Sequence, residues 1–126
     1  MCGICGELRF GGGTTSPDRL TSMRDVLTHR GPDADGLYLS SDRRAGLAFR
    51  RLRILDLSRD ADQPMTNEDG TVQVVFNGEI YNFLELRTEL EAKGHRFRSR
   101  SDTEVIVHLY EDEGEGAIAR LDGMFA

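Results

Sequence analysis

The 126-residue chain has 38% hydrophobic and 30% charged residues and a formal net charge of −6, which predicts one globular domain with a modest core. The negative charge argues against nucleic acid as a partner, because phosphate binding needs clustered cations. No apolar stretch approaches the ~20 residues of a membrane span, and no secretory signal is visible. We therefore expect a cytoplasmic protein without membrane contact.

The first half of the chain predicts strands around one helix. Ile4, Leu8 and Phe10 indicate a first strand, which a run of three glycines ends. Ser16 suits the N-cap of a helix and Pro17 suits its first position, and the Gly-Pro pair at 31–32 terminates it. Further strands are expected over residues 36–40 and 46–57.

The second half predicts a strand, two helices and the beginning of another strand. The β-branched residues 71–77 indicate a strand that stops at a turn formed by Asn77 and Gly78. A helix is expected over about 82–93, with Gly94 as its C-terminal stop. Residues 101–104 (SDTE) form a capping box for the next helix. Paired strands with helices between them favour an α+β sandwich.

Cys2 offers unusual chemistry if Met1 is removed. The small side chain of Cys2 allows this removal. The cysteine then carries a free α-amino group, and such groups titrate at about pH 7.7–8.0. Near neutral pH this amine can accept the proton of the thiol, directly or through one water. The sequence therefore predicts a nucleophile that needs no histidine base, and none of the three histidines lies in a recognisable Cys/His signature: His29, His95 and His108.

Two other interpretations of Cys2 compete with a nucleophile, and from its position alone an inert residue fits equally well. It could be an inert strand residue, or it could form a redox or zinc motif with Cys5 in Cys-Gly-Ile-Cys. Zinc usually takes four ligands, and no second such pair exists in the sequence. A redox pair of this spacing normally opens a helix that follows a strand.

Four sequence blocks carry more specific information: MCGICG (1–6), HRGPD (29–33), FNGEIYN (76–82) and SDTEVI (101–106). In this order they resemble the class II glutamine amidotransferase domain of the asparagine synthetase family, whose nucleophile is N-terminal. Residues 51–58 and 121–126 also fit. The resemblance implies a four-layer αββα sandwich of two mostly antiparallel sheets. It also implies that residues 1–126 are a C-terminally truncated amidotransferase domain, followed in the family by a synthetase domain absent here.

The resemblance assigns a role to each matching position. Cys2 would be the nucleophile, and the Asn77 side chain and Gly78 N–H would form the oxyanion hole. Arg51 would bind the α-carboxylate of glutamine, and Asp102, assisted by Glu79, its α-ammonium group. The remaining substrate-binding positions are Leu52, Arg53, Ile54 and Leu55. Phe49 stands where the family usually has histidine, so we expect altered packing there with activity retained.

The implied function is hydrolysis of L-glutamine to glutamate and ammonia, with ammonia passing to ATP-dependent amidation by the synthetase domain. The alternatives are an amidotransferase for a small peptide acceptor and a non-catalytic glutamine-binding module. No metal or cofactor is expected in this chain, whereas ATP and magnesium belong to the synthetase domain. The sequence leaves open whether the protein forms a homodimer.

Overall fold

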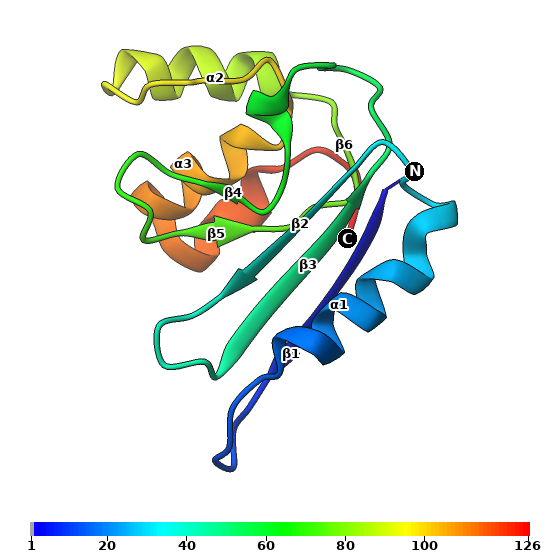
Figure 1. Ribbon diagram of the computed structural model, residues 1–126. Helices are drawn as coiled ribbons and strands as arrows, with labels where there is room; N and C mark the ends of the chain where they lie inside the picture. Colours follow the sequence, from blue (N-terminus) through cyan, green and yellow to red (C-terminus); the bar gives the residue numbers. More distant parts are fainter. Residues whose placement is uncertain (1) are drawn as a thin grey trace.

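A computed structural model describes residues 2–126 and shows an α+β fold with antiparallel sheets (Figure 1). Removal of Met1 concerns a residue outside this range. The largest sheet has the strand order β1-β3-β2, and two smaller sheets pair β4 with β5 and β6 with β7. The strands are β1 (Gly3–Leu8), β2 (Ala34–Leu39), β3 (Ala45–Arg51), β4 (Met65–Thr66), β5 (Gln73–Val74), β6 (Gly78–Ile80) and β7 (Gly123–Phe125).

Helix α1 (Pro17–Val26) covers one face of the three-stranded sheet. Its start follows the prediction: Pro17 is the first residue, and Ser16 Oγ accepts the backbone N–H of Arg19 at 3.4 Å. Leu20 is fully buried and packs over Gly46 of β3, where any larger side chain would collide with it. A 3₁₀ turn, Leu27–His29, then leads to the predicted stop at residues 31–32.

The second half builds a separate core around β6 and two helices, α2 (Phe83–Ala92) and α3 (Glu104–Glu113). Gly94 follows α2 with a φ of 106°, a conformation that glycine adopts at little cost, as expected of a helix stop. A 3₁₀ segment, Gly114–Arg120, packs on α3 and leads into β7. The buried cluster comprises Phe76, Ile80, Leu86, Leu90, Val105, Leu109 and Ala117.

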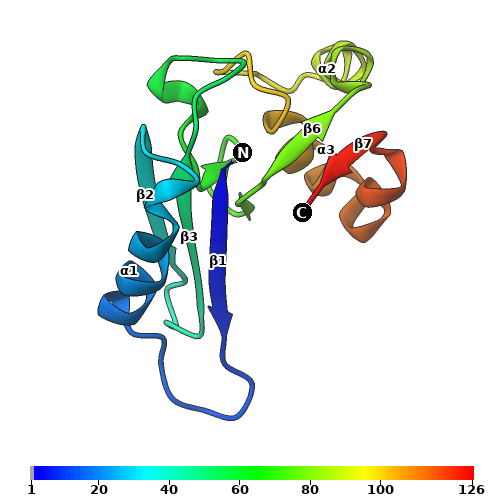
Figure 2. The same cartoon turned by 90° about the vertical axis from the view of Figure 1, so that its right-hand side faces the viewer.

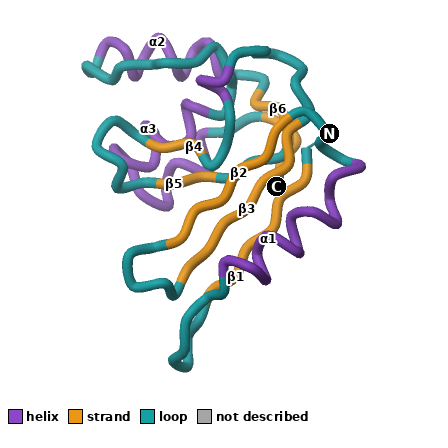
Figure 3. Tube along the Cα trace, in the orientation of Figure 1, coloured by secondary structure: helices purple, strands orange, loops and turns teal. Residues whose placement is uncertain are grey.

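Helix α1 and the second half of the chain lie on opposite sides of the three-stranded sheet. Figure 2 shows α1 on one side of this sheet, and β6, β7, α2 and α3 on the other. Figure 3 shows the same arrangement by element type, with a long loop between β3 and β4. Within residues 2–126, no helix is both long and apolar enough to cross a lipid bilayer.

Three predicted elements differ from the structure. The strand expected over 46–57 ends at Arg51, and the strand expected over 71–77 is ordered as β-structure only at Gln73–Val74. The turn predicted at Asn77 and Gly78 is wrong, because Gly78 begins β6 and pairs with β7. This partner strand is more than forty positions away in the sequence, so local turn signals could not reveal it.

The capping box predicted at 101–104 is also wrong in its bonding. Ser101 Oγ does accept the N–H of Thr103 at 3.2 Å. However, the Glu104 carboxylate accepts the N–H groups of Arg98 and Ser99, at 2.8 and 2.7 Å, instead of the N–H of Ser101. Glu104 therefore fixes the chain that approaches α3 from α2, and α3 itself begins at Glu104.

Candidate active site

A cavity of about 130 Å³ opens where the first and second halves of the chain meet. Its walls come from the start of β1, the end of β3 and the loop after it, β6, and the approach to α3. Every site residue predicted from the sequence lines this cavity except Arg53. The predicted residues that line it are Cys2, Arg51, Leu52, Ile54, Leu55, Asn77, Gly78, Glu79 and Asp102.

The Cys2 side chain is half-buried at the entrance to β1 and is held by the loop after β3. Its Sγ lies 3.4 Å from the backbone nitrogen of Leu52 and 3.6 Å from the Leu52 carbonyl oxygen. Arg30, from the predicted block at 29–33, donates its Nε–H to the Cys2 carbonyl at 3.1 Å. Arg30 thus fixes the backbone of the predicted nucleophile without entering the cavity.

Cys5 has a different environment from Cys2. Both cysteines are free thiols. They are three positions apart, and residues an odd number of positions apart along an extended strand face opposite sides of the sheet. Cys5 lies on the α1 side, where burial raises its pKa and nearby Arg24 opposes this shift. The structure therefore does not support a redox or metal pair formed by Cys2 and Cys5.

The register of β6 against β7 leaves one N–H of β6 directed toward the cavity. Asn77 and Ala126 exchange both backbone hydrogen bonds at 2.9 Å, and Tyr81 donates to Asp122 at 2.7 Å. In an antiparallel pair, bonded and non-bonded positions alternate, so Gly78 and Ile80 direct their N–H groups to the other edge of β6. At that edge Asp102 takes the Ile80 N–H, and the Gly78 N–H faces the cavity.

Asn77 and Gly78 are suited to this edge for different reasons. Among the described residues, Asn77 forms hydrogen bonds only through its backbone, with Ala126, so its side-chain amide at the cavity can donate to a ligand. Gly78 lies so close to β7 that an added Cβ would collide with the Met124 carbonyl oxygen and with Phe125. A glycine is therefore required here by the approach of two strands, not by a tight turn.

Asp102 is buried beside the same strand edge. Its side-chain carboxylate accepts the N–H of Ile80 at 2.9 Å, and Ser101 Oγ lies 3.4 Å from its other oxygen. Burial raises the pKa of Asp102 above its ordinary value, although these hydrogen bonds partly oppose the shift. The cavity therefore has an acidic group that would gain from an ammonium partner.

Arg51 is buried at the end of β3 and organises the loop that follows. Its guanidinium donates to the Ser58 carbonyl and to Asp62 Oδ1, both at 2.6 Å, and to the carbonyl of Asp56. These contacts use three of its five N–H donors. Arg53 is not among the residues that line the cavity: its backbone N–H donates to Asp33 Oδ2 at 2.9 Å, and its guanidinium lies 3.8 Å from Asp62 Oδ1.

Several cavity residues were not predicted from the sequence. Gln63 is buried and joins two walls, because its Oε1 accepts the Phe76 N–H at 2.6 Å and its Nε2 donates to Thr103 at 3.4 Å. Asp56 accepts the N–H of Arg100 at 2.7 Å, and this bond is the main reason that its pKa is lowered. Neither residue has a local sequence signal. Phe49, which replaces the expected histidine, is buried in the cavity wall.

Comparison with known proteins assigns the family. The family model described as a glutamine amidotransferase domain matches residues 1–126. Over the whole chain, identity is 43% to asparagine synthetase [glutamine-hydrolyzing] 1 of Bacillus subtilis and 48% to asparagine synthetase [glutamine-hydrolyzing] 2 of Arabidopsis thaliana. The chain spans 20% and 21% of those two proteins. The chain thus belongs to the glutamine amidotransferase domain family, in the form found in asparagine synthetases.

Proposed function

We propose that this domain hydrolyses L-glutamine with Cys2 as the nucleophile, once Met1 is removed, and releases glutamate and ammonia. The supporting observation is the convergence of the Cys2 thiol, the open N–H of Gly78 and the buried carboxylate of Asp102 on one cavity. These residues are far apart in the sequence, and each offers a group that glutamine hydrolysis needs: an attacking sulfur, an oxyanion donor and an ammonium partner.

The two ends of glutamine match the two sides of the cavity. The side-chain amide would lie between Cys2 and the β6 edge, with its oxygen toward Asn77 and Gly78. The α-ammonium group would lie against Asp102, with Glu79 at the exposed side. The α-carboxylate would take the remaining donors of Arg51 and approach the loop at 52–55.

The reaction proceeds through a thioester. The Cys2 thiol loses its proton to the α-amino group of the same residue, and the sulfur forms a bond to the amide carbon of glutamine. Asn77 and Gly78 stabilise the tetrahedral oxyanion, and a donor of this kind is typically worth ~10²–10³ in rate. The α-ammonium group of Cys2 then protonates the departing nitrogen of glutamine, and ammonia leaves as the C–N bond breaks. Water attacks the γ-glutamyl thioester, giving glutamate and the free thiol.

In a longer protein the ammonia would serve asparagine synthesis, as the names of the relatives state for those proteins. By family resemblance, a synthetase domain would use ATP and magnesium to activate the acid that receives the ammonia. The same resemblance supports a four-layer αββα sandwich for this domain. A small-peptide acceptor is the alternative, and the relatives' names favour aspartate over it.

Glutaminase assays on cysteine variants test the proposal. Cys2→Ala should lower glutamate release by at least ~10³-fold, because no other group near the amide carbon can form the thioester. Cys5→Ala is the matched control, since Cys5 lies on the α1 side of the same strand, and it should retain turnover. Equal turnover in wild type and Cys2→Ala would refute the proposal. Glutamine binding without turnover in wild type would identify a non-catalytic binding module.

A further inference from the structure

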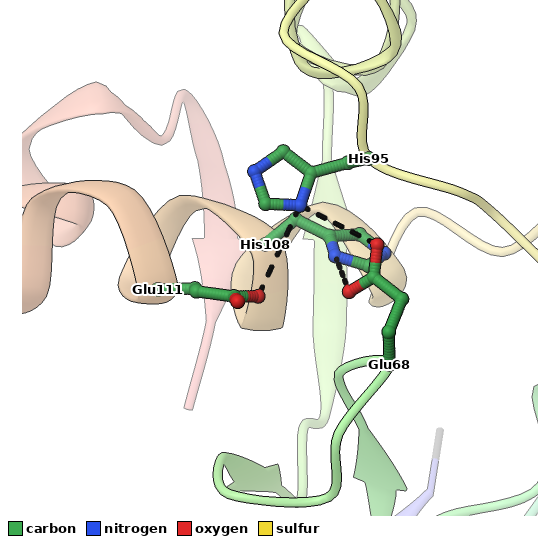
Figure 4. A group of neighbouring side chains, drawn as sticks. All are labelled: Glu68, His95, His108 and Glu111. Carbon is green, nitrogen blue, oxygen red and sulfur yellow. Dashed lines mark ion pairs between the residues drawn. The ribbon is translucent and has the colours of Figure 1, made fainter.

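A second cluster of polar side chains lies outside the cavity, in the second half of the chain. Glu68 comes from the turn between β4 and β5, His95 follows α2, and His108 and Glu111 lie on α3 (Figure 4). We propose that these four residues bind one divalent transition-metal ion, with zinc as the preferred ion. This site is independent of the glutamine reaction, because none of its residues lines the cavity.

The distances within the cluster are close to those of a metal centre. His95 Nδ1 lies 3.5 Å from Glu68 Oε1 and 3.9 Å from Glu111 Oε2, and His108 Nδ1 lies 3.1 Å from Glu68 Oε2. One ligand atom of each residue falls within 4.8 Å of the others. With zinc bonds of about 2.0–2.2 Å, tetrahedral ligand atoms are separated by about 3.3–3.5 Å, so small side-chain movements would complete the geometry.

His108 supplies the observation that points to a metal ligand role. Its side chain is only 1% exposed, yet among the described residues neither ring nitrogen has a hydrogen-bond partner. Glu68 Oε2 approaches Nδ1 without the alignment of a hydrogen bond. A buried polar group left in this state costs stability, whereas a cation placed between the imidazole and the carboxylate would satisfy both.

The groups behind the histidines match those of known metal centres. Ligating imidazoles usually present one nitrogen to the metal and the other to a carboxylate, which fixes the ring. His95 Nε2 bonds Asp112 Oδ1 at 3.0 Å, and Asp112 is held in turn by Lys93 at 3.2 Å. His108 Nε2 lies 3.7 Å from Glu104 Oε1. Both rings therefore direct Nδ1 into the cluster and Nε2 toward an outer carboxylate.

The donor set selects the class of ion. Two imidazole nitrogens and two carboxylate oxygens suit zinc and its transition-metal neighbours, whereas magnesium and calcium prefer oxygen donors alone. Glu68 and Glu111 are each 39% exposed at the side chain, so an ion could enter from solvent. Because the four ligands come from three separate segments, a bound ion would tie α3 to the end of α2 and to the β4–β5 turn.

The sequence alone predicts no metal site, because these ligands have no recognisable spacing. Only His108 and Glu111 are close in the chain, and a histidine and a glutamate three apart are common on exposed helix faces. Glu68 and His95 join them only through the packing of α3 against the β4–β5 hairpin and α2.

Calorimetric titration of the metal-free chain with Zn²⁺ tests the site. Both thiols are first removed by Cys2→Ala and Cys5→Ala, so that cysteine cannot bind the ion, and the protein is dialysed against a chelator. We expect one equivalent of bound zinc, a rise in Tm of several degrees at saturation, and a Co²⁺ absorption spectrum of tetrahedral type. Failure to bind one equivalent would overturn the proposal whether or not Cys2 proves to be the nucleophile.

Three variants in this background separate a built site from chance binding. His95→Gln and Glu68→Gln remove ligands that are not fully buried, and each should weaken zinc binding at least ~100-fold; Asp112→Asn should weaken it ~10–100-fold through loss of the outer carboxylate. His29→Gln is the control, because His29 is exposed and its Nδ1 lies 3.0 Å from the carbonyl oxygen of Val26, outside the cluster. Equal weakening by His29→Gln, or unchanged binding in the ligand variants, would refute the site.

Discussion

Asn77 and Gly78 serve the same proposed oxyanion but are fixed in the structure by different forces. The Asn77 side chain presents its amide at the cavity, whereas Gly78 contributes its backbone N–H and is packed against β7. A substitution of Asn77 should therefore affect activity alone, whereas a substitution of Gly78 should affect both activity and stability. Replacement of each residue by alanine should show this difference.

Asn77→Ala should reduce kcat for glutamine hydrolysis by ~10²–10³-fold with little change in Tm, because only a donor to the oxyanion is lost. Gly78→Ala should reduce both kcat and Tm, because its Cβ would collide with Met124 and Phe125 and push β6 from β7. Steady-state kinetics and thermal unfolding measure both effects. A large loss of stability in Asn77→Ala would contradict the assignment.

The negative charge of Asp102 should lower the stability of the glutamine-free protein and strengthen the binding of glutamine. Burial raises the pKa of its carboxyl group, so its ionised form destabilises the glutamine-free fold above that pKa. This penalty fades as the pH falls through the raised pKa and is absent below the ordinary value of about 3.9. Asp102→Asn should therefore have a higher Tm than wild type at pH 7, and the difference should vanish near pH 4.

The same variant should bind glutamine at least ~10-fold more weakly, because an amide cannot pair with the α-ammonium group. Melting curves recorded across pH with and without glutamine separate the two effects. The idea fails if Asp102→Asn is less stable than wild type at every pH, or if its KM for glutamine is unchanged.

At the scale of elements, the loop after β3 forms one wall of the cavity and depends on Arg51. Ile54 and Leu55 in this loop are 61% and 57% exposed, so little apolar burial holds it in place. Its shape instead comes from the contacts of the Arg51 guanidinium with backbone carbonyls and with Asp62. Arg51 is the main anchor, because it alone contacts three acceptors, whereas the Arg53 N–H bonds Asp33 and the Arg100 N–H bonds Asp56. Its loss should therefore loosen the loop.

Arg51→Lys should destabilise the protein by about 1–3 kcal/mol and raise KM for glutamine, because a single ammonium cannot span the three acceptors. Hydrogen exchange should accelerate across residues 52–58. Arg50→Lys is the matched control on the same strand, since Arg50 contacts Gly31 and Asp35 outside the cavity. Similar loop exchange in both variants would show that Arg51 is not the anchor.

Elements governed by local signals were predictable from the sequence, and those governed by distant partners were not. Ser16 and Pro17 set the start of α1, and Gly94 stops α2, because caps and stops act over a few residues. The pairing of Gly78 with β7 and the bonds of Glu104 to the chain at 98–99 depend on tertiary contacts. The local signals at both places indicated a different bonding pattern.

The candidate site follows the same division. All the site residues assigned from the family blocks except Arg53 line the cavity, because the blocks brought in information beyond local pattern. Gln63 and Asp56 act by bonding backbone N–H groups of segments far away in the chain, which no spacing could indicate. The cluster of Glu68, His95 and His108 escaped prediction for the same physical reason.

For the whole molecule, the cavity depends on the junction between two separately packed halves. The buried cluster of the second half includes Phe76 and Ile80, which flank Asn77 and Gly78, the residues of the proposed oxyanion hole. The first half supplies Cys2 and Arg51. Stability of the second core should therefore control the geometry of β6 relative to the nucleophile.

Leu90→Ala should destabilise the protein by about 2–5 kcal/mol, because Leu90 is fully buried in this cluster and its loss leaves a cavity. Leu84→Ala is the control on the same helix: Leu84 is 65% exposed and its replacement should change stability by no more than about 0.5 kcal/mol. Urea unfolding measures both. Equal effects would show that α2 does not pack as described.

Covalent labelling tests the central claim, that the Cys2 sulfur attacks glutamine in this cavity. The chain is incubated with a glutamine analogue that carries a chloromethyl ketone in place of the side-chain amide, and intact mass and peptide mapping locate the adduct. We predict Met1 to be absent, one adduct on Cys2, and protection by L-glutamine but not by D-glutamine. Labelling of Cys5 at the same rate, or a Cys2 adduct unaffected by L-glutamine, would contradict the account.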